Sequence, residues 1–520
     1  MSDRNLHVIR RVGAVLGHFL VYVLIWAGLA LLIAAAGIRY YWGEISVGQM
    51  LLNLVSVEMD GGGGAIVWMG ILGIGVVPLL LTAGIALWQH VRRRRRRHHG
   101  HDPRPRRTRW IMRTLTTALV GTLVVGGTTA FATTVGVRDY IRAGNSEFDL
   151  GDYYTAPAVT GDQDRRNLVL IYLESGEQTL ANDEHFEKDA FAPLKEVTAA
   201  SDGWQSVADL QQYRGGGWTM AGLTATQCGI PLKGIGSAAD SGALNELGGD
   251  VETYLGGTTC LGDVLDEHGY RSVFLGGANA SFAAKDTFLS SHGYDEVKDL
   301  SDWRAAGEPE ESFRGDWGLS DGRLMAHAAD EIDELHAEAE QTGRPFNLSV
   351  LTLDTHEPVH IYDYCTVDTQ NEVTSAFFCS MTQVAGFVEH MEEQGYLEDT
   401  AVVIMGDHLK HMSAGDAFHE QLDHHDNRTI FNRIWVPGAD TTKAPRPGVD
   451  QLSMYPTLLE AAGLSLQDRA AGLGVSAFAP TVPEGSAQAM EPELYAELLG
   501  SRSAPFYAEA WAGEDAAQQS

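Results

Sequence analysis

Basic residues are scarce over most of this chain. Of its 37 Lys and Arg, 16 lie within residues 1–138, together with only 5 of its 69 Asp and Glu. The remaining residues therefore carry 21 basic against 64 acidic side chains, a net charge of about −43. Because such a surface repels the phosphates of nucleic acid, this deficit excludes nucleic acid as a partner. The same charge favours solubility and tolerates a divalent cation.

Cysteine is also rare. The four cysteines, Cys228, Cys260, Cys365 and Cys379, all lie in the acidic region, and no two of them form a C-x-x-C pair. The lack of such a pair disfavours a zinc site. An even number of cysteines predicts two disulfides if this region lies in an oxidising compartment. We expect Cys228–Cys260 and Cys365–Cys379, because the other pairings would cross-link distant parts of the fold.

Long apolar runs occur near the N-terminus, at 12–38, 65–88 and 111–137. Each is long enough to cross a hydrocarbon core of roughly 30 Å, which takes about 20 helical residues. The first run exceeds the apolar region of a signal peptide, so we interpret it as a retained anchor. The sequence therefore predicts a membrane domain of three spans over residues 1–138.

The orientation of these spans follows from arginine-rich segments. Arg92–Arg97 form an unbroken run between the second and third spans, and five more arginines follow by residue 113. Such a density of positive charge holds a loop in the cytoplasm. Arg4, Arg10 and Arg11 hold the N-terminus on the same side. Three crossings then place everything after about residue 138 outside the cytoplasm.

The region after the spans divides into three parts. Residues 139–164 are polar and rich in Gly and Asp, which predicts a linker. From 165 to 480, short apolar runs alternate with amphipathic stretches, which predicts a mostly parallel α/β sheet covered by helices on both faces. Residues 481–520 are rich in Ala, Glu and Ser and predict a C-terminal tail that is partly flexible. The expected strands are 168–173, 272–275, 346–353, 401–405 and 433–436, and the expected helices are 260–268, 319–340, 374–394 and 453–462.

Two of the expected strands end on side chains that bind metals. One leads into Glu174, and another leads into Asp407 and His408. Strands of an open α/β sheet present their C-terminal ends to the ligand crevice, so these three side chains can converge. Carboxylates and imidazole suit Mn²⁺, Mg²⁺ or Zn²⁺, and the sequence does not choose among them.

A glycine-rich segment supplies a hydroxyl that could join these ligands. Three glycines at 215–217 precede Trp218 and Thr219 and let the backbone approach a ligand closely. A Thr hydroxyl is a weak nucleophile that needs a nearby base or metal. Thr224 and Thr226 are alternatives, although capping or packing is the ordinary role of a Thr in a helix.

These segments resemble membrane-anchored phosphoglycerol transferases of the alkaline phosphatase/sulfatase superfamily, which include lipoteichoic acid synthases and the phosphoglycerol transferases of periplasmic glucans. The resemblance covers roughly residues 165–475, and its motifs occur in the order typical of that family. They are Leu-Glu-Ser at 173–175, Gly-Gly-Trp-Thr at 216–219, Cys-Gly-Ile-Pro-Leu at 228–232, Gly-Ala-Asn-Ala-Ser-Phe-Ala-Ala-Lys-Asp at 277–286, Asp-Thr-His-Glu-Pro at 354–358 and Gly-Asp-His at 406–408.

The resemblance implies an enzyme of the bacterial inner membrane with an extracytoplasmic catalytic domain. It would move a phosphoglycerol group from phosphatidylglycerol, through a covalent Thr219 intermediate, to a hydroxyl of an extracytoplasmic glycan or glycolipid, and release diacylglycerol. Glu174, Thr219, Asp407 and His408 would bind one divalent ion, with Mn²⁺ favoured over Mg²⁺ or Zn²⁺.

The resemblance also implies substrate-binding residues. His356 would bind a phosphoryl oxygen or protonate the leaving alkoxide, and Lys285 would pair with the donor phosphate. Arg314, Trp317 and Asp321 would line the donor or acceptor pocket, with helix capping and core packing as the equally weighted alternative. In lipoteichoic acid synthases the 277–286 segment carries a substrate-binding Trp and Arg, whereas this chain has Ala283 and Lys285 there.

Three alternative functions are left open. A phosphoethanolamine transferase shares the Thr-and-metal core, but such enzymes usually carry more spans and further histidines. A sulfatase or phosphatase would act by hydrolysis, but Cys228 lies one residue out of register with the sulfatase Cys-x-Pro-x-Arg motif. A non-catalytic envelope protein that binds a glycan would have no need of a metal-activated nucleophile.

His424, His425 and Asp426 are consecutive and resemble a metal-binding cluster. We interpret them as exposed residues of a polar loop.

Overall fold

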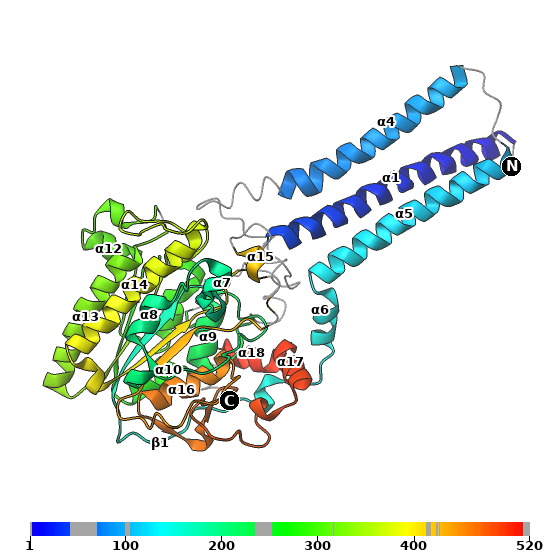
Figure 1. Ribbon diagram of the computed structural model, residues 1–520. Helices are drawn as coiled ribbons and strands as arrows, with labels where there is room; N and C mark the ends of the chain where they lie inside the picture. Colours follow the sequence, from blue (N-terminus) through cyan, green and yellow to red (C-terminus); the bar gives the residue numbers. More distant parts are fainter. Residues whose placement is uncertain are drawn as a thin grey trace. The chain divides into compact units, whose positions relative to one another are not determined.

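The computed structural model describes residues 3–41, 70–98, 105–234, 252–315, 317–411, 418–422, 425 and 427–512. The chain divides into two compact units, the first ending at Ile141 and the second beginning at Arg142 (Figure 1). Each unit is described by itself. Of the sequence-based expectations, the start of the second apolar run at 65–69, Arg104, His424 and Asp426 lie outside the described residues.

Long apolar helices build the first unit. They are α1 (Asp3–Tyr41), α4 (Val77–His98), which continues the π-helical turn η1 (Ile71–Val76), and α5 (Arg106–Thr134). Three segments are long and apolar enough to cross a membrane, and they overlap the three predicted runs; they are Leu16–Tyr40, Leu72–Arg92 and Trp110–Thr134. These helices indicate that the chain is a membrane protein.

Two glycines let α1 and α5 pack closely. A Cβ atom placed on Gly127 would lie 2.5 Å from the carbonyl oxygen of Gly28. Small residues at such a crossing are typical of helices that associate in lipid, because they bring the two backbones together. Tyr22 on α1 also donates a hydrogen bond of 3.0 Å to Gln89 on α4.

A six-stranded sheet forms the centre of the second unit, with the order β4-β3-β5-β2-β6-β7. All neighbouring strands are parallel except the edge strand β7, which is antiparallel to β6. This confirms the predicted mostly parallel sheet, although β4 was not expected. The strands are β2 (Asn167–Leu173), β3 (Arg271–Gly276), β4 (Glu296–Lys298), β5 (Phe346–Leu351), β6 (Thr400–Gly406) and β7 (Asn432–Trp435).

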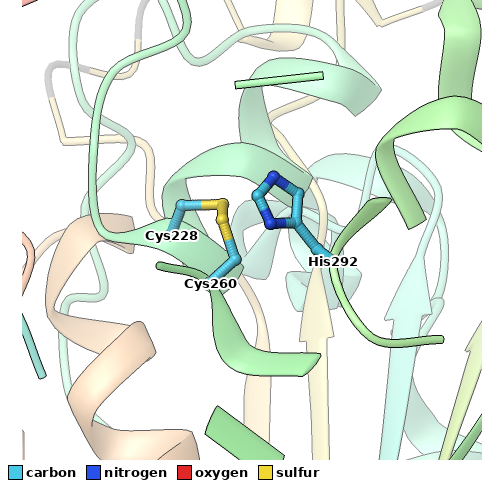
Figure 2. A group of neighbouring side chains, drawn as sticks. All are labelled: Cys228, Cys260 and His292. Atoms are coloured by element: carbon cyan, nitrogen blue, oxygen red, sulfur yellow. A yellow bond between two sulfur atoms is a disulfide. The ribbon is translucent and has the colours of Figure 1, made fainter. Parts of the chain in front are cut away.

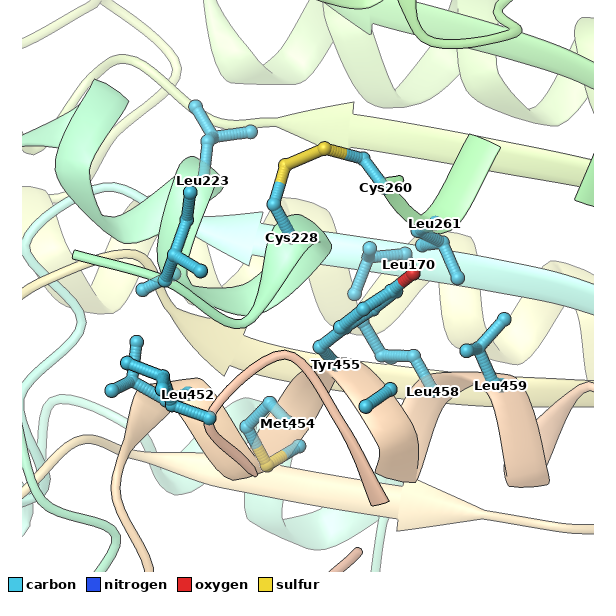
Figure 3. Close-up of a cluster of buried hydrophobic side chains, with 14 of the residues drawn as sticks. Leu170, Leu223, Cys228, Cys260, Leu261, Leu452, Met454, Tyr455, Leu458 and Leu459 are labelled. Carbon is cyan, nitrogen blue, oxygen red and sulfur yellow. A yellow bond between two sulfur atoms is a disulfide. The ribbon is translucent and has the colours of Figure 1, made fainter. Parts of the chain in front are cut away.

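The sheet separates two hydrophobic cores. Alternate residues of β2 enter them, because successive side chains of a strand point to opposite faces. Leu168, Leu170 and Tyr172 join one core, and Val169 and Ile171 join the other. Figure 3 shows part of the first core, where side chains of α9, α10 and α16 pack together with Leu170 of β2. The helices that contribute to this core include α9 (Thr219–Cys228), α10 (Leu261–Glu267) and α16 (Met454–Ala461), and those of the other include α8 (Ala192–Val197), α13 (Asp321–Thr342) and α14 (Glu372–Glu393).

Two segments contain more structure than the sequence predicts. The expected linker 139–164 includes the end of α6 (Val137–Gly144) and the strand β1 (Val159–Gly161), which pairs with β8 (Ser465–Leu466). The expected tail contains α17 (Pro492–Gly500) and α18 (Ala504–Ala510), and residues of both helices are buried in the first core. The region beyond residue 480 is therefore folded as far as residue 510, because its few apolar side chains have a core to join.

Candidate active site

The carboxyl ends of β2 and β6 bring the predicted ligands together. The two strands are in register with Leu173 opposite Gly406, so Glu174 lies beside Asp407 and His408. One ligand atom from each of these three side chains lies within 4.8 Å of the others, and all three residues are buried. Two carboxylates and an imidazole at this spacing can hold one divalent cation.

Hydrogen bonds fix these side chains in an orientation that suits a cation. Asp407 Oδ1 accepts the backbone N–H groups of Ser175 (2.9 Å) and His408 (2.7 Å), whereas Asp407 Oδ2 is buried and has no hydrogen-bond partner in the described part of the chain. His408 Nδ1 lies 2.8 Å from the carbonyl of Leu409, which assigns the proton to that nitrogen. Its Nε2 faces the carboxylates and lies 3.5 Å from Glu174 Oε1. The donor set therefore fits a metal.

Ser175 is a site residue that sequence reasoning missed. Its φ of 56° lies in the left-handed region, which a side chain other than glycine rarely adopts. In this conformation its hydroxyl donates to Glu174 Oε1 over 2.9 Å while its N–H donates to Asp407. Backbone strain of this kind concentrates at functional sites. The signal in the sequence was its place directly after Glu174, at the end of a strand.

Thr219 begins helix α9 and faces the same cluster. Its hydroxyl donates to Glu174 Oε2 over 3.3 Å. The helix can approach this closely because a Cβ on Gly222 would lie only 2.1 Å from the carbonyl oxygen of Asp407. The alternatives Thr224 and Thr226 are fully buried, and the Thr226 hydroxyl is engaged with Tyr172 at 2.7 Å. Of the three threonines, Thr219 is the one whose hydroxyl bonds to Glu174 in the described structure.

A disulfide ties the far end of this helix to the fold (Figure 2). Cys228, the last residue of α9, is bonded to Cys260 at the start of α10, with a Cα–Cα distance of 4.1 Å. His292 lies beside the bridge, with its ring nitrogens 2.7 Å from Asp263 Oδ2 and 2.7 Å from the Tyr254 carbonyl. Since both sulfurs are used in the bridge, this trio is not a metal site. The second pair is Cys365–Cys379, so both pairs are those expected from the spacing.

The electrostatics of the cluster couple its members. Burial pushes the pKa of Glu174 upward, but the charges of His408 and His356 and hydrogen bonds from His408 and Ser175 outweigh it and lower the pKa. Burial and the neighbouring Glu174 charge raise the pKa of Asp407 to about 7. Burial lowers the pKa of His408, but Asp407 and Glu174 outweigh it and raise that pKa to about 9. So much negative charge in a buried place favours a bound cation.

Lys285 is a buried cation close to this cluster. Burial lowers its pKa, and the charges of Glu174 and Asp407 oppose that shift. Its amino group makes no hydrogen bond or ion pair with any residue that the structure describes. The turn before it places Ala283 and Ala284 at φ of 57° and 53°, in the left-handed region. The strain of two such alanines fits a segment that holds a ligand.

His356 lies in the turn after β5, with Trp317 against it. The two ring centroids are 4.5 Å apart, and burial lowers the pKa of the imidazole. His356 Nδ1 is 2.7 Å from the Glu357 carbonyl, which leaves Nε2 available. Arg314 donates to the carbonyl oxygens of His356 (2.9 Å) and Pro358. Arg314 therefore holds the His356 turn in place, which leaves open whether it also lines a pocket.

The contacts of Asp321 fit the helix-capping and packing alternative that the sequence left open beside a pocket role. It is fully buried at the start of α13, and its carboxylate accepts the backbone N–H groups of Leu353 (2.7 Å) and Asp354 (3.2 Å) and the hydroxyl of Ser380 (2.6 Å). With these lone pairs occupied, Asp321 connects the helix to the strand end instead of facing a ligand. His425 packs edge-to-face on His185, with centroids 5.1 Å apart.

Comparison with known proteins agrees with this architecture. Residues 166–464, more than half of the chain, match the sulfatase family. The chain belongs to the sulfatase family. This confirms the resemblance and the fold class inferred from the motifs, and it places all the residues of the candidate site within the matched region.

Curated proteins that are similar to this chain include two with the same name. Phosphoglycerol transferase I of Salmonella typhimurium and that of Salmonella choleraesuis are each 33% identical over 287 residues, which is 52% of this chain and 34% of the relative. The chain thus spans about a third of the length of these curated relatives. The solved structures matched by this chain include an alkaline phosphatase superfamily protein from Vibrio parahaemolyticus (18% identity, TM-score 0.49, 72% of this chain and 93% of that one). They also include the lipoteichoic acid synthase LtaP from Listeria monocytogenes (14% identity, TM-score 0.49, 68% of this chain and 95% of that one).

Proposed function

We propose that this chain is a metal-dependent phosphoglycerol transferase of the bacterial inner membrane. The observation that carries the proposal is the Thr219 hydroxyl, which lies at the start of a helix 3.3 Å from the carboxylate of Glu174, one of three clustered side chains that could hold a metal ion. The curated relatives that share about half of this chain bear the name phosphoglycerol transferase. The donor would be phosphatidylglycerol, and the acceptor would be a hydroxyl of an extracytoplasmic glycan or glycolipid.

Glu174, Asp407 and His408 would hold one divalent cation, with Mn²⁺ favoured over Mg²⁺ and Zn²⁺, and Thr219 would complete its ligands. When bound, such an ion lowers the pKa of the Thr hydroxyl and polarises a phosphoryl oxygen. Lys285 supplies a second positive charge for the phosphate. Because this amino group has no anionic partner at bonding distance in the described structure, a phosphate oxygen would fill that place.

The transfer would take two steps, first to Thr219 and then to the acceptor. Thr219 Oγ1 forms a bond to phosphorus while the phosphorus–oxygen bond to diacylglycerol breaks, and the diacylglycerol oxygen takes up the proton that Thr219 lost. An acceptor hydroxyl then attacks phosphorus, the Thr219 ester breaks, and the acceptor's proton returns to Thr219. Neutral His356, with Nε2 free, serves as the proton carrier in both steps.

The membrane spans suit a lipid donor. Three membrane spans with an arginine-rich cytoplasmic loop would place the catalytic unit outside the cytoplasm. Anchoring confines the enzyme and its lipid substrate to the same surface, so the donor is met in two dimensions.

The full-length chain in vesicles tests this proposal. Vesicles that contain headgroup-labelled phosphatidylglycerol should yield diacylglycerol only with a divalent cation, and phosphatidylethanolamine vesicles should yield far less. Thr219→Ala should lower the rate by roughly three orders of magnitude or more, as expected for an activated nucleophile. Thr224→Ala is the control and should stay active. Equal release from both lipids, or release by Thr219→Ala, contradicts the proposal.

A further inference from the structure

Three rings lie in a row on the segment that follows the His356 turn. The ring centroids of His360 and Tyr362 are 4.5 Å apart, and those of Tyr362 and Tyr364 are 5.4 Å apart with nearly parallel planes. Tyr362 is buried between its neighbours, whereas His360 is exposed and Tyr364 is 48% exposed. We call these three residues the aromatic strip.

The aromatic strip is held in place without a ligand. The Tyr364 hydroxyl donates to Asp354 Oδ2 and accepts the backbone N–H of Gly322, each over 3.3 Å. The next residue, Cys365, is bonded to Cys379 on α14. A surface that is already ordered loses little conformational entropy when it binds, so the strip is suited to recognition.

The strip is continuous with the candidate active site. His360 follows Pro358 by two residues, and Arg314 fixes the carbonyls of both His356 and Pro358. Asp354, which Tyr364 contacts, belongs to the same turn as His356. A ligand that rests on the strip therefore lies at the edge of the site where His356 handles the proton.

The chemistry of this surface selects among ligands. A tyrosine ring offers an amphipathic face with a polar rim, which matches the C–H face and hydroxyl edge of a sugar ring. Residues 359–371 contain Asp363 and Asp368 but no Lys or Arg, and the region after residue 138 carries a net charge of about −43. Like charges repel, so an anionic polymer is disfavoured and a neutral saccharide is favoured.

We propose that the aromatic strip is the acceptor-binding surface and that its ligand is a neutral saccharide. Tyr364 stacks against one sugar ring, and His360 exchanges hydrogen bonds with the hydroxyls of that ring or the next. This inference rests on the proposed function, because it supplies the acceptor for the phosphoglycerol group. It adds a location and a charge class that the proposed function leaves open.

The test uses full-length Thr219→Ala protein in phosphatidylglycerol nanodiscs, so that binding is measured without turnover. The probes are maltoheptaose and laminariheptaose, two neutral glucose oligomers, and oligogalacturonate as the anionic counterpart, each followed by saturation-transfer NMR. The neutral probes should bind and the anionic probe should not. Tyr364→Ala should weaken binding roughly tenfold, as truncation of a central aromatic anchor does, while Tyr364→Phe should keep most of it. Leu494→Ala, an exposed position on α17, is the matched control and should bind like the parent.

Several results would overturn the proposal. They are the absence of neutral saccharide binding, preference for the anionic probe, and unchanged binding by both Tyr364→Ala and His360→Ala. His360 makes no hydrogen bond in the described structure, so its substitution separates recognition from folding if Tyr364→Ala proves unstable. Diacylglycerol release by the wild-type protein is measured alongside. Its absence counts against the proposed function, whereas release without strip-dependent saccharide binding counts against the strip alone.

Discussion

The two units use apolar and charged side chains in opposite ways. In the first unit, large apolar residues such as Leu16, Leu80 and Leu119 are more than half exposed, as suits contact with lipid. In the second unit, the exposed large apolar residues among those described are Phe282, Tyr364, Val367 and Leu494. The second unit also buries charged groups, among them the carboxylates of Glu174 and Asp407 and the amino groups of Lys285 and Lys410. An exposed ring or a buried charge is therefore ordinary in one unit and informative in the other.

The largest effect is expected where the catalytic unit buries most charge. Asp407→Asn keeps the size of the side chain but removes its charge, and should abolish stoichiometric metal binding. Activity should fall by roughly a hundredfold or more, since even outer partners of metal ligands are worth about 10–100-fold. Elemental analysis and diacylglycerol release measure the two quantities in the same sample. Exposed Asp183→Asn is the control, and full metal content in Asp407→Asn would refute the shared site.

The second largest effect is expected from the two disulfides. All four cysteines lie in the second unit and none in the first. Replacing both Cys228 and Cys260 by Ser should lower the free energy of unfolding by about 3 kcal/mol, and replacing both Cys365 and Cys379 by slightly less. The sequence separations of 32 and 14 residues set that order. Loss of the first pair should also lower activity more than loss of the second, because Cys228 anchors α9, the helix that begins at Thr219. Denaturant unfolding of the catalytic unit checks this, and equal loss of activity in both variants contradicts the anchoring role.

Close packing provides a smaller effect. Gly222→Ala places a methyl group against the Asp407 carbonyl and should destabilise the catalytic unit by roughly 1–3 kcal/mol while displacing Thr219. Gly386 lies inside α14 with nothing within 4 Å of an added Cβ. Gly386→Ala should instead stabilise by up to about 1 kcal/mol. Thermal unfolding of both variants measures the contrast, and equal shifts would argue against the tight contact between α9 and Asp407.

The smallest effect concerns pH. Burial raises the pKa of Asp321 to about 6, above its ordinary value in the unfolded chain. Between about pH 4 and pH 6 the folded state therefore binds the proton more tightly, so this contribution to stability is present at low pH and is lost as pH rises through 6. Asp321→Asn lacks that term. The free energy of unfolding of the wild type minus that of Asp321→Asn should therefore fall as pH rises from about 4 to about 6, which denaturant unfolding at several pH values measures. A rise of this difference with pH would contradict the raised pKa of Asp321.

Much of the fold of the second unit could be predicted from the sequence, because β2 and β6 are nearly continuous apolar runs at the centre of the sheet and β5 interrupts its apolar residues only with Asn347 and Ser349. Strand β4 was missed because it has three residues and two of them are charged. Helices α17 and α18 were missed because their Ala- and Glu-rich composition also suits a flexible tail, and only the core they join decides between the two.

The convergence of Glu174, Asp407 and His408 could be predicted because strand ends converge in such sheets, whereas the contacts of Asp321 and Ser175 could not. Whether a carboxylate faces a ligand or the backbone depends on tertiary contacts. A left-handed φ at a serine leaves no mark in the sequence.

The central claim is that Thr219 carries the phosphoglycerol group between donor and acceptor. Wild-type protein should be incubated with phosphatidylglycerol and a divalent cation without acceptor, quenched in acid, digested and analysed by mass spectrometry. The account predicts phosphoglycerol on the peptide that contains Thr219, and its disappearance when a saccharide acceptor is added before the quench. Release of diacylglycerol with no modified Thr219, or with the group on Thr224 or Thr226, would contradict it.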